Sequence, residues 1–341
     1  MAQGLFCTLL VGTILNTIGQ QLHIEFLNQI IVTIGSGEGA AAYTIGGLAS
    51  AMVGPGIAVA VGAALACPPL VLYSLIPVGF AANAIAGAGG PLAVYLVTIA
   101  ASELGKLVSK ETRVDILVTP CVTVLFGIML SLVVARPLGQ AAQAIGYAIM
   151  WATELQPFFM GMLVSVIIGL ALTLPISSAA ICAAFGLTGL AGGAAVAGCC
   201  AQMIGFAVMS FKENRWGGLV AQGIGTSMLQ MPNILKNPRI LIPPTLASMI
   251  TGPLATCLFK LQMNGAPVSS GMGTCGFVGQ IGVYTGWVND VASGAKAAIT
   301  AFDWMGLVLI CFILPALISW GTCEVMRRRG HIAEGDLKLD L

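Results

Sequence analysis

The stretch that decides the fold reads Leu174-Pro175-Ile176-Ser177-Ser178-Ala179-Ala180-Ile181. It lies inside residues 155–211, a segment that contains no Lys, Arg, Asp or Glu. A proline directly after an apolar run predicts that the helix ends there, and the two serines can cap a helix that restarts. An ordinary proline kink, in which both serines bond their own backbone, explains the same residues. The stretch therefore predicts a long apolar helix that is either broken or kinked near its end.

The composition of the whole chain places that helix in a membrane. Of 341 residues, 8% are charged, 14 of them Lys or Arg and 13 Asp or Glu, whereas soluble domains carry roughly 25%. Apolar residues make up 57%, and the mean hydropathy is +0.97. So few charges cannot cover a soluble surface. This excludes a soluble enzyme, a disordered tail and a nucleic-acid binder, which needs a basic face. The fold class is an all-α polytopic membrane protein.

Glycine adds a second constraint, because the chain contains 44 of them. Small residues let helices approach closely in a bilayer and also mark broken helices that line a cavity. Apolar faces with paired glycines, such as Gly46-Gly47 and Gly192-Gly193, predict close helix packing and self-association.

Charge-free runs predict about ten transmembrane helices. The candidate spans are 4–19, 43–66, 68–84, 88–102, 116–135, 157–174, 189–211, 217–232, 240–259, 270–289 and 304–323. Three consecutive arginines, Arg327-Arg328-Arg329, follow the last span and predict a cytoplasmic C-terminus. We therefore expect one integral membrane domain over residues 1–323, followed by a short cytoplasmic tail over 324–341.

A second break is predicted at Ser270–Gly282 (SGMGTCGFVGQIG), which is too rich in glycine for a helix that faces lipid. If the basic residues around Lys236 and the three arginines lie on the same side, an even number of crossings separates them. Three apolar runs lie between, so one of them does not cross. We interpret the glycine-rich run as a re-entrant hairpin, which together with the break at residues 174–181 makes two.

Amides and hydroxyls without carboxylates mark the candidate binding residues. They recur in Gln222–Arg239, and such groups suit neutral polyols or backbone-like partners because they supply both donors and acceptors. Polar contacts that hold helices together are the alternative. A solute leaving water needs its hydrogen bonds replaced, which broken helices can do. The predicted substrate-binding residues are Ser177, Ser178, Asn233, Asn264, Ser270, Thr274 and Gln280.

The sequence predicts neither catalytic nor metal-binding residues. There are two histidines and ten cysteines, most of the cysteines lie in apolar runs, and no CxxC motif occurs. Nucleotide-binding, zinc-protease and serine-hydrolase motifs are also missing from the sequence. We therefore expect a protein that is not an enzyme and needs no cofactor.

Four stretches together resemble a known family. They are Leu174–Ile181 (LPISSAAI), Gly198–Phe211 (GCCAQMIGFAVMSF), Gln222–Pro244 (QGIGTSMLQMPNILKNPRILIPP) and Ser270–Gly282. They are similar to the bacterial PfoR-like membrane proteins, named as toxin regulators and grouped with the membrane IIC (EIIC) components of the sugar phosphotransferase system. The resemblance covers most of the chain and is densest from about 157 to 290.

The resemblance implies a IIC-like transporter fold in the bacterial cell membrane. It implies a homodimer, a scaffold part at about 1–155 and a transport part at about 156–300 that holds substrate between broken helices and hairpins. Sugar IIC proteins commonly use a membrane Glu and a His near the sugar, and neither hairpin here contains one. The fused IIA and IIB phospho-carrier domains are also missing, so phosphorylation would require separate partner proteins.

The sequence is consistent with two functions. The broken helices, the amides and the resemblance favour a transporter of a small polar, sugar-like solute. The regulator name favours a membrane sensor that controls gene expression through a cytoplasmic partner, although the short tail offers little interface. A channel is less favoured, because no ring of like charges is visible to select ions. Solute binding to the purified protein would separate the first two.

Overall fold

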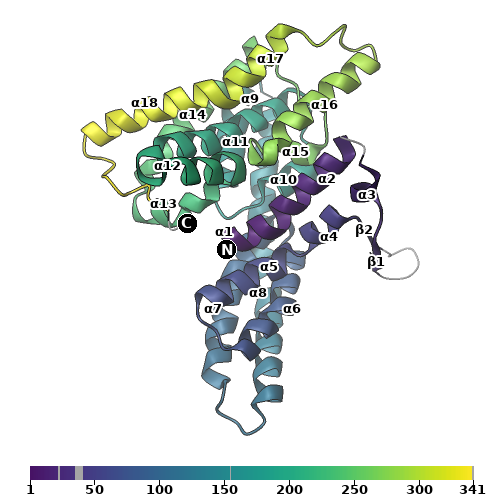
Figure 1. Cartoon of the computed structure of the whole chain (residues 1–341), viewed down its shortest axis with the longest axis vertical. Helices are drawn as coiled ribbons and strands as arrows, with labels where there is room; N and C mark the ends of the chain where they lie inside the picture. Colours follow the sequence, from purple (N-terminus) through teal and green to yellow (C-terminus); the bar gives the residue numbers. More distant parts are fainter. Residues whose placement is uncertain (22–23, 35–40, 154, 340–341) are drawn as a thin grey trace. The chain divides into compact units, whose positions relative to one another are not determined.

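The structure, a computed structural model, describes residues 1–21, 24–34, 41–153 and 155–339. It divides into two compact units, Met1–Gln143 and Ala144–Leu341, and each is described by itself. Helices make up most of both (Figure 1). The all-α class predicted from composition is confirmed.

In the described part of the chain, five helical segments are long and apolar enough to cross a membrane. They are Pro69–Val108, Asp115–Thr153, Gly189–Met209, Pro238–Leu258 and Ala301–Arg328. A sixth is added if Ile45–Ala51 and Val53–Ala64, which meet at a bend of 53°, form one span. The chain is therefore a multi-pass membrane protein, and the expectation of about ten crossings stays a prediction.

The first unit contains mainly helices. Its elements are α1 (Ala2–Leu5), η1 (Phe6–Leu10), α2 (Val11–Gln21), α3 (Glu25–Asn28), β1 (Val32–Ile34), β2 (Ala41–Tyr43), α4 (Ile45–Ala51), α5 (Val53–Ala64), α6 (Pro69–Ala86), η3 (Gly87–Gly89), α7 (Gly90–Val108) and α8 (Asp115–Thr153), whose last residues belong to the second unit. The strands pair antiparallel, with Val32 opposite Tyr43. This hairpin was not predicted from the sequence, although the β-branched run at residues 30–34 favours a strand.

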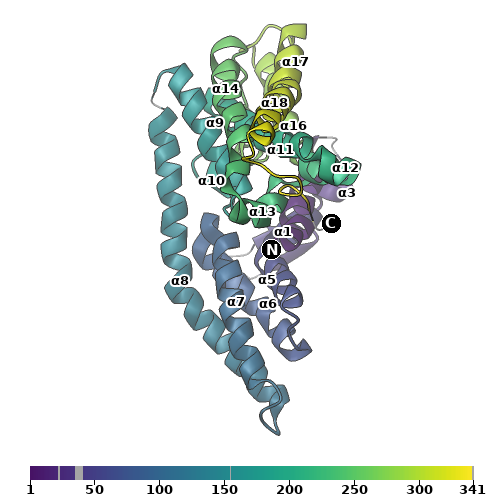
Figure 2. The ribbon, with the colours of Figure 1, turned by 90° about the vertical axis from the view of Figure 1, so that its left-hand side faces the viewer.

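Helices α6 and α7 fold back on each other (Figure 2). They pack against α8, because a Cβ on Gly127 of α8 would overlap the side chain of Val78 in α6. The reversal occurs at Gly87, whose φ of +54° suits glycine. At the other end of the pair, a Cβ on Gly105 would lie 2.8 Å from the side chain of Val71, so the helices touch backbone to side chain. The segment Pro69–Val108 is therefore a helical hairpin, as the separate candidate spans at 68–84 and 88–102 predicted.

The second unit holds the remaining elements. They are α9 (Pro157–Thr173), α10 (Ser178–Ala184), α11 (Gly189–Met209), α12 (Phe211–Val220), η4 (Ala221–Gly225), η5 (Ser227–Gln230), α13 (Met231–Lys236), η6 (Pro238–Leu241), α14 (Ile242–Pro253), η7 (Leu254–Leu258), α15 (Pro267–Ser270), η8 (Cys275–Phe277), α16 (Val278–Ala292), α17 (Ala301–Val308), η9 (Leu309–Ile313) and α18 (Leu314–Arg328).

Helix α11 is the centre of this unit and is buried along most of its length. It packs against α9, α14 and α18. The helices come close because small residues face each other: a Cβ on Gly198 would overlap the carbonyl of Ser165. The Ser165 hydroxyl also donates a hydrogen bond of 2.7 Å to the carbonyl oxygen of Ser248 in α14. This is the close packing by small residues that bilayers favour.

Three of the predicted spans differ from the structure. The run at 116–135 is only the first half of α8, because neither Arg136 nor Pro137 ends that helix. The run at 43–66 is bent by 53°. The run at 217–232 is not one helix: η4 ends at Gly225, the backbone of Thr226 is extended, and a short 3₁₀ turn follows. Gly223 and Gly225 lie just before the extended Thr226, and glycine weakens a helix at such a position.

The glycine pairs predicted to mediate self-association are used inside the chain. A Cβ on Gly46 would overlap the backbone of Gly12, and a Cβ on Gly193 would overlap the carbonyl of Leu261. These faces are therefore occupied by helices and loops of the same molecule. Helix α18 continues to Arg328, so the first residues of the predicted tail at 324–341 are helical, and the boundary of the membrane domain stays a prediction.

Candidate functional site

Two interruptions of the helical backbone meet in the second unit, where α10 and α15 lie side by side (Figure 1). Leu174 is extended after α9, and Ser177 caps α10 by accepting a 3.2 Å bond from the backbone N–H of Ala180. That cap is the own-backbone bond expected of a proline kink. The Ser178 hydroxyl instead donates a bond of 2.7 Å to the carbonyl oxygen of Gly271. The helix is therefore broken, and the two predicted breaks are in direct contact.

The second break lies against α11. The Ser270 hydroxyl donates a 2.6 Å bond to the carbonyl oxygen of Leu187, just before α11 begins. The Thr274 hydroxyl donates to the sulfur of Met203, in the middle of α11, at 3.5 Å. Both hydroxyl-bearing residues are fully buried. The structure thus brings Ser178, Ser270 and Thr274 to one place.

Gln280, in the first turn of α16, is the residue of this region with an unmet hydrogen bond. Its side-chain amide donates to the sulfur of Cys200 at 3.2 Å. Its carbonyl oxygen Oε1 is buried and has no hydrogen-bond partner, and the residue is 8% exposed. A buried acceptor without a donor costs about 1–3 kcal/mol. The side chain therefore holds an acceptor that a hydroxyl or amide of a ligand could satisfy.

A second set of polar side chains lies around Gln202 of α11. The hydroxyl oxygens of Thr173 and Ser227 lie 2.8 Å apart, and the Thr173 hydroxyl lies 3.3 Å from Oε1 of Gln202. The Gln202 amide donates to the hydroxyl of Thr245 at 3.3 Å. We call Thr173, Gln202, Ser227 and Thr245 the polar cluster. It lies at the point where α9 ends, so it borders the first break.

Thr173, Gln202 and Thr245 are not among the site residues predicted from the sequence. Each is an isolated polar residue in or beside an apolar run, and such residues are common on helices that pack against one another. A glutamine in the middle of a charge-free run was the available signal, because an amide there needs several partners. Ser227 lies in the amide-rich stretch that the sequence did indicate.

The structure places two predicted residues away from the breaks. Asn233 donates a 2.8 Å bond to the backbone carbonyl of Lys338, in the C-terminal tail. Asn264 donates a 2.8 Å bond to the carboxylate of Asp290, near the end of α16. Their side chains are thus engaged by other parts of the chain.

The chemistry of this region suits a neutral polar ligand. Hydroxyls and carboxamides supply its hydrogen-bonding groups, and each can donate or accept. Among the residues that the structure describes, no group of His, Cys, Asp and Glu is arranged to hold a metal ion. The arrangement can replace the hydration of a solute without contributing a net charge.

The comparisons with known proteins place the chain in a family. The family model described as phosphotransferase system, EIIC, matches residues 1–339. No curated protein and no solved structure matches the chain. The match spans both units and agrees with the apolar, multi-pass helical architecture. The chain belongs to the phosphotransferase system EIIC family, and it is a membrane permease component of that type.

Proposed function

We propose that this permease component transports a small, neutral, sugar-like solute and binds it beside α11, between the two broken-helix hairpins. The observation that carries the proposal is the buried, unpartnered Oε1 of Gln280. Family membership supports transport, and the uncharged hydrogen-bonding groups support a neutral solute.

A solute that enters the site must first be desolvated. A polyhydroxylated solute loses its hydrogen bonds to water on entering an apolar protein interior, and each unsatisfied group costs several kcal/mol. Gln280 offers an acceptor for one solute hydroxyl without breaking an existing bond. Ser177, Ser178, Ser270 and Thr274 provide further hydroxyls around the same breaks. These are the residues that we propose contact the solute.

The two outer residues of the predicted site have a lesser role in this proposal. Asn233 and Asn264 would reach solute only after exchanging their present partners, Lys338 and Asp290. We propose that they line the approach to the site. The polar cluster, which the structure adds, lies where α9 ends and the first break begins, and it extends the polar surface along α11.

The organisation of the transporter follows from the resemblance to IIC proteins. We propose that the first unit is the scaffold and the second the transport part, close to the division predicted at residue 155. The protein acts as a homodimer in the bacterial cell membrane, with its C-terminus in the cytoplasm. If solute is phosphorylated during transport, the phosphoryl group comes from separate IIA and IIB proteins.

A solute screen tests the proposal. The purified protein in detergent is heated with hexoses, hexitols, disaccharides, amino acids and nucleosides, and its melting temperature is recorded. Because a ligand that binds the folded state stabilises it, a neutral polyhydroxylated solute should raise the melting temperature in a concentration-dependent way. If only charged solutes stabilised the protein, the proposal of a site for a neutral solute would be rejected. A well-folded protein that none of the solutes stabilises would reject the transport proposal.

A further inference from the structure

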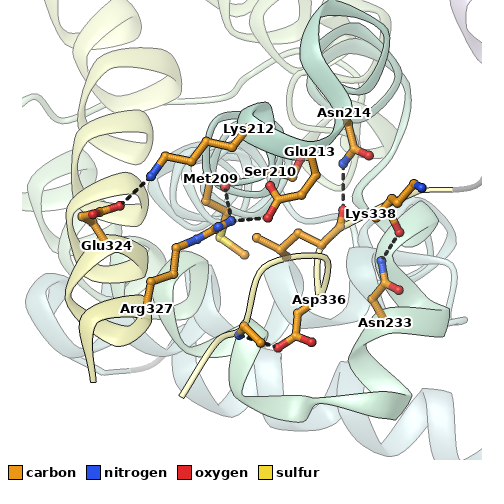
Figure 3. Close-up of polar contacts among 12 residues, drawn as sticks. Met209, Ser210, Lys212, Glu213, Asn214, Asn233, Glu324, Arg327, Asp336 and Lys338 are labelled. Atoms are coloured by element: carbon orange, nitrogen blue, oxygen red, sulfur yellow. Dashed lines mark hydrogen bonds and ion pairs between the residues drawn. The ribbon is translucent and has the colours of Figure 1, made fainter. Parts of the chain in front are cut away.

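The C-terminal tail is bound back onto the second unit instead of projecting from it (Figure 3). After α18, the chain turns at Gly330 and Gly335, whose φ values are +72° and +93°. Ile332 and Leu337 are then inserted into an apolar cluster with Phe206 and other residues, and they are 2% and 0% exposed. We call residues 329–339 the strap.

Side-chain amides hold the backbone of the strap. Asn214 donates to the carbonyl oxygen of Leu337 at 2.7 Å and accepts from the backbone N–H of Leu339 at 2.8 Å. Gln230 donates to the same Leu337 oxygen at 3.0 Å, and Asn233 donates to the carbonyl of Lys338 at 2.8 Å. Figure 3 shows Asn214 and Asn233 reaching the strap. Leu337 is thus fixed by its apolar side chain and by its main chain together.

Two of the amides that hold the strap, Gln230 and Asn233, are joined to each other and to Gln222. Gln230 donates to Oε1 of Gln222 at 2.9 Å, and its own Oε1 accepts a 2.8 Å bond from Asn233. Gln222 in turn donates to the Ser210 hydroxyl at 2.8 Å. Gln222, Gln230 and Asn233 lie in residues 221–237, the segment that also carries Ser227, whereas Asn214 lies in α12. One side of the segment 221–237 contacts the polar cluster, because Ser227 contacts Thr173. The strap is bonded to Gln230 and Asn233 of the same segment.

Ion pairs lie where the strap leaves α18. Arg327 pairs with Glu213 at 2.6 Å, and their side chains are 12% and 9% exposed. Lys212 pairs with Glu324 at 3.0 Å (Figure 3). Burying the Arg327–Glu213 pair removes two charges from water, which offsets much of their attraction, and the more exposed Lys212–Glu324 pair is screened by solvent and contributes little. The two apolar anchors and the amide bonds are therefore the main attachment of the strap.

We propose that the strap is a releasable latch that keeps residues 221–237 closed over the polar cluster. When the strap detaches, this segment loses its outer contacts and Ser227 can separate from Thr173. The gating of solute by this latch rests on the proposed function, whereas the closure itself depends only on the contacts described above. The latch is a regulatory device built from the chain's own C-terminus.

The test measures access to the polar cluster in the full-length protein in lipid nanodiscs. All variants carry Ser227→Cys, so the effect of that replacement is shared. A cationic methanethiosulfonate reagent is added, and the rate of modification of each cysteine is followed by peptide mass spectrometry. Leu337→Ala removes an anchor, and Val325→Ala, at an exposed position of α18, is its control. Asn214→Ala removes amide bonds, and Asn289→Ala, at an exposed position of α16, is its control.

The latch predicts that modification at position 227 becomes at least about tenfold faster in Leu337→Ala and Asn214→Ala and stays unchanged in both controls. Cys199 and Cys200, which are fully buried, should remain unmodified and so report an intact fold. If Leu337→Ala exposes these cysteines, Asn214→Ala, which keeps both apolar anchors, decides the question. Equal rates in all folded variants would overturn the latch. The reagent needs no solute, so this result is independent of the solute screen.

Discussion

The hydroxyl of Ser178 donates a hydrogen bond of 2.7 Å to the carbonyl oxygen of Gly271, a residue 93 positions further along the chain. The two backbones also approach closely, because a Cβ on Gly271 would lie 2.6 Å from the carbonyl carbon of Ser178. Two helix breaks that are far apart in sequence therefore form one contact. This contact sets the position of Ser270, Thr274 and Gln280 beside α11.

Replacing Ser178 with alanine should weaken that contact. The Gly271 carbonyl would be left without this donor, so we expect the free energy of unfolding to fall by about 1–2 kcal/mol. Denaturant titration of the purified protein measures the change. Ser293→Ala, at an exposed position after α16, is the control and should change stability much less. Equal stabilities of the two variants would show that the hydrogen bond does not hold the breaks together.

The packing of α11 against α9 predicts a larger effect at Gly198. A Cβ there would overlap the Ser165 carbonyl, and backbone cannot rotate away as a side chain can. We expect Gly198→Ala to cost about 1–3 kcal/mol or more through overpacking. Gly321→Ala, in α18, is the matched control, because nothing lies within 4 Å of its added Cβ. Thermal unfolding of both variants checks the difference, and a Gly198→Ala protein as stable as the control would contradict this packing.

Much of the fold could be predicted because the membrane leaves few choices. Most charge-free apolar runs in a membrane are helical, so α6, α9 and α11 begin and end close to the predicted limits, whereas α7 continues past the predicted end at 102 to Val108. The predicted helix limits were wrong where a single charge or proline was interpreted as the end of a helix. Arg136 and Pro137 lie inside α8, because a single charge or proline does not stop a helix whose flanks continue it. The β1–β2 hairpin needed the pairing of two short segments, which periodicity does not reveal.

The candidate site was predictable in part for the same reason. Pro175 and the glycines of residues 270–282 interrupt helices through their own backbone properties, so both breaks could be found locally. The contact between the breaks depends on tertiary packing. The pairing of Thr173 with Ser227, 54 residues later, and the binding of the tail by Asn214 and Asn233 also depend on distant parts of the chain.

The orientation of the chain can be tested at Lys338. Its side chain is exposed although its carbonyl is bonded to Asn233, so a cysteine at this position can react with a reagent that reaches it. The arginines after the last span predict a cytoplasmic tail. Lys338→Cys should resist an impermeant maleimide in intact cells and react after the membrane is permeabilised. Efficient labelling in intact cells would reverse the predicted orientation.

Self-association is predicted from the resemblance to IIC proteins alone, because the chain's own helices and loops occupy Gly46 and Gly193. We expect native mass spectrometry from nanodiscs to show two chains per particle. Gly46→Ala should lower stability, since its Cβ would overlap Gly12, without being needed for the dimer contact. A monomer at all protein concentrations, in both mild detergent and nanodiscs, would reject the homodimer.

Equilibrium binding to Gln280→Ala tests the central claim most directly. The unpartnered Oε1 of Gln280 should accept a bond from the solute, so its loss should weaken binding by about 1–3 kcal/mol, roughly five- to hundredfold in Kd. The solute found by the stability screen is titrated into wild type, Gln280→Ala and Gln156→Ala, an exposed glutamine that makes no capping bond. We predict a Kd raised at least fivefold in Gln280→Ala and unchanged in Gln156→Ala. A folded Gln280→Ala protein that binds the solute as tightly as wild type would contradict the account.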